Sequence, residues 1–200
     1  MLTLTRKVGE RLVIGTDIEI TVVEVVRGKV RLAISAPRTM PILRGEVIER
    51  IIDENRRAVP AMEISAKPET RLAIDFPEGI LGLPTHRSFV VMDVADRPGL
   101  RALVSTIDPS ILLLVVEATE LAPDYPVERA RELSGHEETD VAVALVVTLP
   151  ANSAVATVNL LAPIVIGMSS RRGVQVILEG MGLPVRCELI DIPDEIEAAH

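Results

Sequence analysis

Three arginines near the start of the sequence have the chemistry to bind nucleic acid: Arg6, Arg38 and Arg44. A guanidinium donates paired hydrogen bonds to a phosphate or to the O6/N7 edge of guanine, which a lysine ammonium does less well. Leu4 alternates with Arg6 along an expected first strand, so both side chains share one face. Aromatic residues make up only 2% of the chain, so backbone groups, arginine planes and aliphatic contacts would have to hold an RNA. Residue chemistry alone leaves open that these arginines form a solvated edge.

The sequence carries no comparable signature of an enzyme. It has none of the motifs GxGxxG, GxxxxGKS/T, HExxH or CxxC. His86, His136 and His200 are scattered, without a partner at a spacing typical of a catalytic triad or a metal site. His136 precedes two glutamates and could imitate a metal cluster, but a solvated loop explains that run more simply. We therefore predict that the protein is not an enzyme and uses no metal or cofactor.

Charge divides the chain into two parts. Residues 1–57 hold eleven Lys and Arg against eight Asp and Glu, a net charge of +3, whereas residues 58–200 hold ten against twenty-one, a net charge of −11. The overall acidity would argue against a nucleic-acid partner, but it belongs to one end only. No apolar run approaches the roughly 20 residues of a membrane span, no signal peptide is recognisable, and Cys187 is the only cysteine. These features predict a cytoplasmic protein without a membrane partner.

Apolar–polar alternation predicts five short strands at the N-terminal end, at residues 2–4, 11–14, 18–26, 29–35 and 39–43. From Arg44 the period becomes helical, and four apolar residues share one face: Val47, Ile48, Ile51 and Ile52. The opposite face is expected to be the polar one: Glu46, Glu49, Arg50, Asp53 and Glu54. Five strands and one helix in a domain at 1–57 are marginal for an independent core, so size alone predicts a dimer.

Residues 58–68 are predicted to be a linker, because they carry two prolines and little periodicity. Residues 69–190 form a second domain in which strand-like segments dominate, with one helix predicted at 125–133. Many short strands separated by turn residues favour an antiparallel β-barrel or sandwich. The last ten residues, 191–200, are an acidic tail. The predicted fold class is mainly β throughout.

The N-terminal part contains three blocks in register: MLTLTRKVGERLVIG, VRLAISAPR, and Arg44 with the helix after it. Together they resemble the carbon storage regulator (CsrA/RsmA) family without a gap over residues 1–55. The resemblance implies an intertwined homodimer, in which the first strand of one subunit lies beside the last strand of the other. It also implies binding to GGA motifs in hairpin loops of mRNA leaders, and no DNA partner. Each RNA site would combine Leu4 and Arg6 of one chain with Arg44 of its partner.

Two residues depart from that family's pattern. Leu43 stands where the family usually has a polar residue, often His, and Gly45 stands where it commonly has an acidic one. Glycine is a poor helix former, and both changes flank the key Arg44. We expect RNA binding to be retained, with weaker contacts around this arginine.

The second part contains FPEGILGLP at 76–84, a DP pair ahead of an apolar run, APDY at 122–125, and TVNLLAPIVI followed by RRGVQ within 157–175. In this order the blocks resemble the flagellar assembly factor FliW family over roughly residues 69–180. Leu81, Leu83 and Gly167 stand where that family usually has proline, an aromatic residue and asparagine. The same blocks could also be the turn chemistry of another β-barrel.

The second resemblance implies a small β-barrel without catalytic residues that binds flagellin. It also implies binding to the carbon storage regulator, which relieves repression of flagellin synthesis. The candidate contacts to flagellin or another partner are Asp124, Tyr125, Asn159, Arg171 and Arg172. The candidate contacts between the two domains lie on the helix: Ile48, Ile51, Ile52 and Asn55.

Together the two resemblances predict a repressor of translation fused to its antagonist, with flagellin mRNA the expected target and flagellin the signal. Tethering raises the effective concentration of the antagonist to the order of mM, and the opposite charges favour docking. Two alternatives stay open. In one, the N-terminal domain only dimerises a flagellin-binding assembly factor or chaperone. In the other, the C-terminal barrel is an enzyme or a small-ligand binder.

Overall fold

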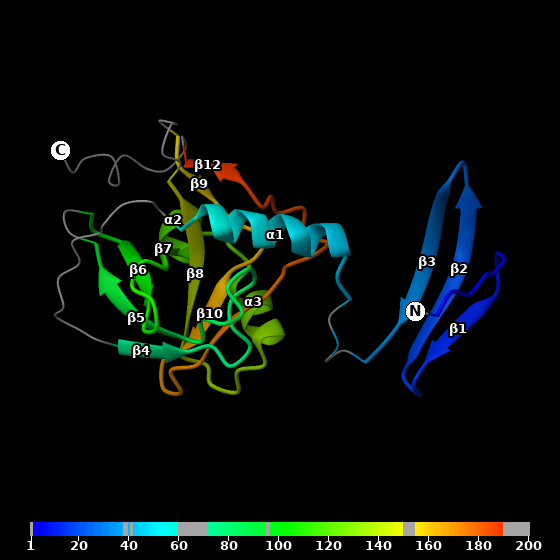
Figure 1. Ribbon diagram of the computed structural model, residues 1–200, viewed down its shortest axis with the longest axis horizontal. Coiled ribbons are helices and arrows are strands. Elements are labelled where there is room, and N and C mark those ends of the chain that lie inside the picture. Colours follow the sequence, from blue (N-terminus) through cyan, green and yellow to red (C-terminus); the bar gives the residue numbers. More distant parts are fainter. Residues whose placement is uncertain are drawn as a thin grey trace. The chain divides into compact units, whose positions relative to one another are not determined.

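The computed structural model of the chain contains two compact units, Met1–Ile42 and Leu43–His200, each with its own sheet (Figure 1). Three predictions concern residues outside the described ones: Arg38 as an RNA contact, most of the linker at 58–68, and the tail at 191–200. The structure describes residues 2–37, 40, 42–59, 72–94, 97–149 and 155–189.

The first unit is a three-stranded antiparallel sheet in the order β1-β2-β3. Its strands are β1 (Arg11–Ile14), β2 (Ile18–Val26) and β3 (Lys29–Ser35). The tight turn between β2 and β3 has Arg27 at φ 46° and Gly28 at φ 79°. Two left-handed residues in succession are typical of the type I′ turn, whose twist matches that of a hairpin. The Arg-Gly pair therefore fixes the register of the longest hairpin in this unit.

Of the five strands predicted for this end, three are present and the first, at 2–4, is absent, whereas the last, at 39–43, lies partly outside the described residues. Within the described residues, neither the segment 2–7 nor the segment 42–44 forms a strand. An extended segment becomes a strand only when a neighbour pairs with its backbone N–H and C=O groups. The family resemblance places that neighbour in a second subunit, so one chain alone does not make the pairing that the alternation pattern allows.

One face of this first sheet is apolar and open to solvent. The register sets Leu12 opposite Ile20, Ile20 opposite Ile34, and Val22 opposite Leu32, so these five side chains share a face. Leu32 is 49% exposed and Ile34 is 40% exposed. A sheet needs a second layer over its apolar face to be stable. The unit therefore presents a surface that fits another apolar layer.

The second unit is built on a nine-stranded sheet with antiparallel pairing between its strands, and its main path runs β11-β10-β8-β7-β6-β5-β4. β9 pairs with β8 and β12, off this path. The strands are β4 (Leu72–Asp75), β5 (Ser88–Asp93), β6 (Leu100–Ser105), β7 (Leu112–Glu117), β8 (Val141–Thr148), β9 (Thr157–Val158), β10 (Ile164–Gly167), β11 (Gly173–Gln175) and β12 (Cys187–Glu188).

The barrel predicted for this unit is not closed. Asp75 at the end of β4 meets Arg172 beside β11 in a single parallel bridge, and the Asp75 N–H donates to the carbonyl of Arg171 at 2.9 Å. A closed barrel needs ladder pairing all the way round. Seven antiparallel strands in a row make the two end strands parallel, and β11 has only three residues. Pairing between the β4 end and the β11 end therefore stops after one bridge, and the sheet does not close into a barrel.

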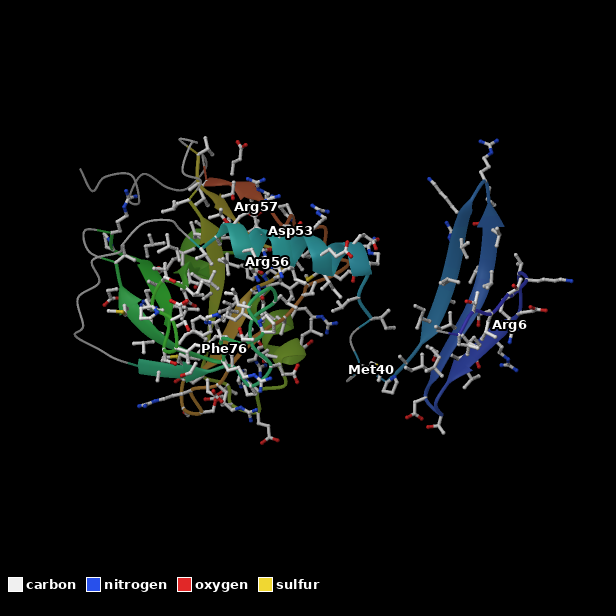
Figure 2. All side chains as sticks on the ribbon, viewed as in Figure 1. Arg6, Met40, Asp53, Arg56, Arg57 and Phe76 are labelled. Atoms are coloured by element: carbon white, nitrogen blue, oxygen red, sulfur yellow. The ribbon has the colours of Figure 1, made fainter. Side chains whose placement is uncertain are left out.

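Among the described residues, three helices accompany this sheet: α1 (Gly45–Arg57), α2 (Ala118–Leu121) and α3 (Val127–Ser134). The helix predicted at 125–133 corresponds to α3, whereas the single turn α2 was not predicted. The core is mostly aliphatic, with Phe76 and Phe89 fully buried and packed edge to face, their ring centroids 5.4 Å apart. Figure 2 shows Phe76 inside this unit. Figure 1 shows α1 lying along the sheet beside β8.

Candidate nucleic-acid interface

Leu4 and Arg6 lie on the segment that precedes β1, and both are exposed. The Arg6 Nη1 donates a hydrogen bond to the backbone carbonyl of the neighbouring Thr5 at 3.1 Å. Figure 2 shows the Arg6 side chain on the outside of the first unit. A ligand can therefore reach both predicted contacts without any rearrangement of the sheet.

Arg44 stands at the N-cap position of α1, with extended backbone angles of φ −79° and ψ 131°. Its guanidinium Nε donates to Oε1 of Glu179, and its backbone N–H donates to Oε2 of the same carboxylate at 3.3 Å. The Arg44 side chain is 66% exposed and the Glu179 side chain is 18% exposed. The arginine at the centre of the predicted RNA site is thus held by a carboxylate from the far end of the chain.

The apolar face of α1 is buried in the second unit. Val47 and Ile51 are buried, Ile51 completely. They join a cluster formed with residues from the β10 region and from the segment before β12: Leu161, Ala162, Ile177 and Val185. Ile48 and Leu43 are partly buried against the same cluster. Leu43, which departs from the family's usual polar residue, therefore contributes to this packing.

Gly45, the other departure, has no such explanation. A Cβ added at this position would meet nothing within 4 Å. No contact in the described structure accounts for a glycine here.

Asn55, one of the predicted interdomain contacts, is fully buried at the C-terminal end of α1. Its Nδ2 donates to the carbonyl of Leu81 at 2.8 Å and to Oε1 of Gln175 at 2.9 Å. Gln175 also accepts from the Leu81 N–H at 3.1 Å and donates through Nε2 to the carbonyl of Ala162 at 3.0 Å. Buried amides are stable only when their donors and acceptors are satisfied in this way. The network therefore fixes the position of α1 on the sheet.

Glu54 was expected on the solvated face of the helix, and that prediction is wrong: its side chain is 3% exposed. Thr148 Oγ1 donates to its Oε1 at 3.0 Å and Thr157 Oγ1 does so at 3.3 Å. Arg186 Nε lies 3.3 Å from Oε2, and Arg57 Nη1 lies 3.8 Å from the same oxygen. A buried carboxylate is tolerated when it is paired and hydrogen-bonded. Apart from Arg57 on the same helix, the partners come from β8, β9 and the segment before β12, far away in sequence, so helical periodicity could not reveal them.

The loop between β4 and β5 packs directly on the backbone of α1. A Cβ added to Gly82 would lie 3.0 Å from the carbonyl oxygen of Ile52 and 3.4 Å from Cγ of Arg56. Gly82 also has φ 88°, in the left-handed region that glycine enters without steric cost. The second glycine of the FPEGILGLP block is therefore required by the close approach of this loop to the helix.

The predicted partner contacts on the second unit fall into two groups. Asp124, Arg171 and Arg172 are exposed. Tyr125 and Asn159 are buried, and each has a structural role. The Tyr125 hydroxyl donates to the carbonyl of Leu160 at 2.6 Å, and the Asn159 Oδ1 accepts from the backbone N–H groups of Leu161 and Ala162 at 3.1 and 3.0 Å. The exposed group is the one that a partner can reach in this conformation.

Arg172 lines an open groove of about 690 Å³ that also contains Glu78, His136 and Glu138. The Ser170 hydroxyl and the Ser169 N–H donate to the Glu138 carboxylate, and these hydrogen bonds lower the pKa of Glu138. The groove therefore presents a fixed anionic group beside a guanidinium. In the described part of the chain, no cluster of His, Cys, Asp and Glu could hold a metal ion. Among the described helices, none is long and apolar enough to cross a bilayer.

The first unit is a small sheet, and the second is a sheet that buries the helix which follows Arg44. The chain is therefore a protein of two modules joined at this helix. Comparison with known families gives the modules their names. The chain belongs to the FliW protein family over residues 58–189 and matches the CsrA global regulator protein family over residues 1–53. It is a fusion of these two modules.

Individual relatives agree with this assignment. The N-terminal part is similar to proteins named translational regulator CsrA. The one from Clostridium botulinum (strain ATCC 19397 / Type A) is 53% identical over 58 residues, which cover 29% of this chain and 81% of the relative. The one from Lachnospira eligens is 44% identical over 64 residues, which cover 32% and 88%. The crystal structure of a flagellar assembly factor FliW matches with a TM-score of 0.52 and 27% identity, over 61% of this chain and 86% of that one.

The boundary between the families does not coincide with the boundary between the compact units. The CsrA match ends at residue 53, inside α1, whereas the second compact unit begins at Leu43. By sequence, most of α1 belongs to the regulator, but by packing it belongs to the FliW module. Glu179 lies in a turn outside every block that was singled out in the sequence, so no local signal pointed to its contact with Arg44.

Proposed function

We propose that this chain is a post-transcriptional regulator that binds GGA motifs in mRNA leaders and represses translation. In this proposal the FliW module is its built-in antagonist, and flagellin mRNA is the expected target. The observation that supports the proposal best is the burial of α1 in the FliW module through Ile51, Glu54 and Asn55. The helix that follows the key Arg44 is thereby held in one position by the second module.

We place the RNA sites on a homodimer of the first unit. The apolar face with Leu32 and Ile34 at 49% and 40% exposure fits a second copy of the same sheet. The segment that carries Leu4 and Arg6 would become a strand when it pairs with the partner subunit. Each RNA would then contact Leu4 and Arg6 of one chain and Arg44 of the other.

Docking of α1 would limit RNA binding in two ways. The second part of the chain has a net charge of −11, and a phosphate backbone approaching Arg44 meets this field. The buried contacts of Glu54 and Asn55 also hold the helix in one orientation. A partner that loosens or remodels the FliW module would therefore raise the affinity for RNA.

Flagellin is the partner we propose for this role. The exposed Asp124, Arg171 and Arg172 lie on the FliW module, and Arg172 lines the groove that contains Glu138. A mixed pair of fixed charges in an open groove favours a polar protein segment over a small apolar ligand. Both flagellin and the mRNA leader are made in the cytoplasm, where we place the protein.

The test is an electrophoretic titration of the full chain with a GGA hairpin from a flagellin leader and with the same hairpin changed to CCA. We expect tighter binding to GGA, a loss of that preference in Arg6→Ala, and a gain in affinity when flagellin is added. The full chain is needed because removing residues 58–200 would expose Val47 and Ile51. Equal binding of the two hairpins would refute the proposed function.

One observation favours a second candidate function. Arg44 is engaged by Glu179 and Leu43 is packed into the hydrophobic cluster, which suits a chain whose N-terminal module only dimerises. The protein would then be a flagellin-binding assembly factor that ignores RNA. In that case flagellin would bind the full chain, whereas neither hairpin would be retarded even when flagellin is present.

A further inference from the structure

The carboxylate of Glu179 lies at the start of α1, where an anion is bound favourably. It accepts one hydrogen bond from the Arg44 guanidinium and one from the Arg44 backbone N–H at 3.3 Å. Helix N-termini present unpaired N–H groups and the positive end of the helix dipole. The N-cap residue itself makes no side-chain capping bond in this helix of 13 residues. Glu179 therefore supplies the negative charge that this end of the helix favours.

An RNA phosphate would use the same donors. Phosphate oxygens and the O6/N7 edge of guanine accept paired hydrogen bonds from a guanidinium. Phosphates also bind at helix N-termini for the same electrostatic reason as carboxylates. A guanidinium whose Nε donates to Glu179 cannot present its full set of donors to a second anion. The Glu179 carboxylate and an RNA phosphate therefore compete for the Nε edge of the guanidinium and for the Arg44 backbone N–H.

Glu179 is held in place by its surroundings. It follows the buried residues Val176–Leu178 and precedes Gly180, which has φ 87°. The Leu178 N–H donates to the carbonyl of Leu161 at 2.9 Å, which ties this segment to the loop before β10. With a side chain only 18% exposed, Glu179 loses less side-chain freedom on pairing than a fully solvated glutamate would. The contact is thus preorganised from the Glu179 side.

We propose that Glu179 is an internal mimic of an RNA phosphate, which competes directly with RNA for Arg44. This inference rests on the proposed RNA-binding function and adds to it a named residue and a mode of inhibition. Inhibition by Glu179 is competitive and local, in contrast to the long-range repulsion by the acidic module as a whole. Releasing Arg44 then requires only that the turn at residues 179–180 move away from the start of α1.

The experiment measures the affinity of the full chain for the GGA hairpin in Glu179→Gln, which keeps the side-chain size and removes the charge. We expect binding about three- to tenfold tighter, because an ion pair with one exposed partner contributes modestly. The matched control is Glu188→Gln on β12, which removes the same charge at an exposed position of the same module. We expect the affinity of this control to stay within about twofold of the parent chain. Thermal unfolding of both variants checks that each remains folded.

Arg44→Ala distinguishes the competition by Glu179 from the proposed RNA-binding function. If Glu179 acts through Arg44, the gain from Glu179→Gln disappears when both changes are combined. If Arg44→Ala weakens RNA binding but Glu179→Gln does not tighten it, the competition is refuted while the proposed function stands. If no variant, including Glu179→Gln, prefers the GGA hairpin over the CCA hairpin, the proposed function itself fails.

Discussion

Replacing Glu54 with Ala tests whether the buried carboxylate fastens α1 to the FliW module. The substitution removes the acceptor for the hydroxyls of Thr148 and Thr157, at 3.0 and 3.3 Å, and for the guanidinium of Arg186, at 3.3 Å. A hydrogen bond to a charged group contributes about 1.5–3 kcal/mol, whereas the pair with the half-exposed Arg186 contributes less than about 1 kcal/mol. Burial of the carboxylate costs several kcal/mol, which the substitution also relieves. We expect a net loss of about 2–3 kcal/mol in the unfolding free energy of this unit.

The assay is urea denaturation of the full chain, followed by tyrosine fluorescence. The chain has one Tyr and no Trp, and Tyr125 is buried in the FliW module, so the signal reports this unit alone. Glu49→Ala is the matched control, because Glu49 is exposed on the same helix and gains the same helix propensity. The reasoning is refuted if Glu54→Ala changes the unfolding free energy by no more than the control does.

Three further predictions follow from other contacts. Gly82→Ala should destabilise the docked helix by about 2 kcal/mol and speed amide hydrogen exchange in α1. The added Cβ strains the left-handed backbone and lies 3.0 Å from the Ile52 carbonyl oxygen. The control Gly135→Ala has the same backbone strain without that contact, and should leave amide exchange in α1 unchanged. Burial raises the pKa of the Tyr125 phenol, so the stability gained by burying the neutral phenol is fully present below about pH 10 and is lost as the pH rises beyond it. The absorbance of tyrosine at alkaline pH should show ionisation only together with unfolding. A reversible ionisation of Tyr125 in the folded protein at lower pH would contradict this prediction. Leu32→Lys should shift the chain from dimer to monomer in light scattering, and an unchanged mass would remove the apolar sheet face as the dimer surface.

Much of the fold could be predicted because local chemistry determines it. The Arg-Gly turn at 27–28 and the alternation around it specify the β2-β3 hairpin, and helical periodicity specifies α1. The segment at 2–4 has the pattern of a strand, but its pairing depends on a neighbour that a single chain does not supply. Barrel closure likewise depends on the lengths and directions of β4 and β11, which alternation does not encode.

The candidate site was less predictable, since its decisive contacts join residues far apart in sequence. Periodicity placed Ile51 correctly on the buried face of α1, but it placed Glu54 on the solvated face. The error arose because polarity alone assigns a glutamate to water unless a partner is known. Apart from Arg57 on α1 itself, the partners of Glu54 and of Arg44 lie 94 or more residues further along the chain. Only the folded arrangement of β8, β9 and the turn at 179–180 brings them together.

If the FliW module acts as the antagonist in the way we propose, the path of the chain from α1 into this module also fixes how many inhibitors each regulator has. Where a regulator and its antagonist are separate proteins, the cell sets their ratio through expression, and a surplus of either one shifts the response. Here the two are made in equal numbers from a single message, so changes in gene dosage or translation alter the total amount and leave the ratio at one to one. In the proposed function, the threshold of such a switch depends on the contacts around Arg44 and α1 and on the affinities for flagellin and RNA, and not on the relative amounts of the two modules. Selection can therefore tune it through substitutions in the protein, but not through the ratio in which the two modules are made.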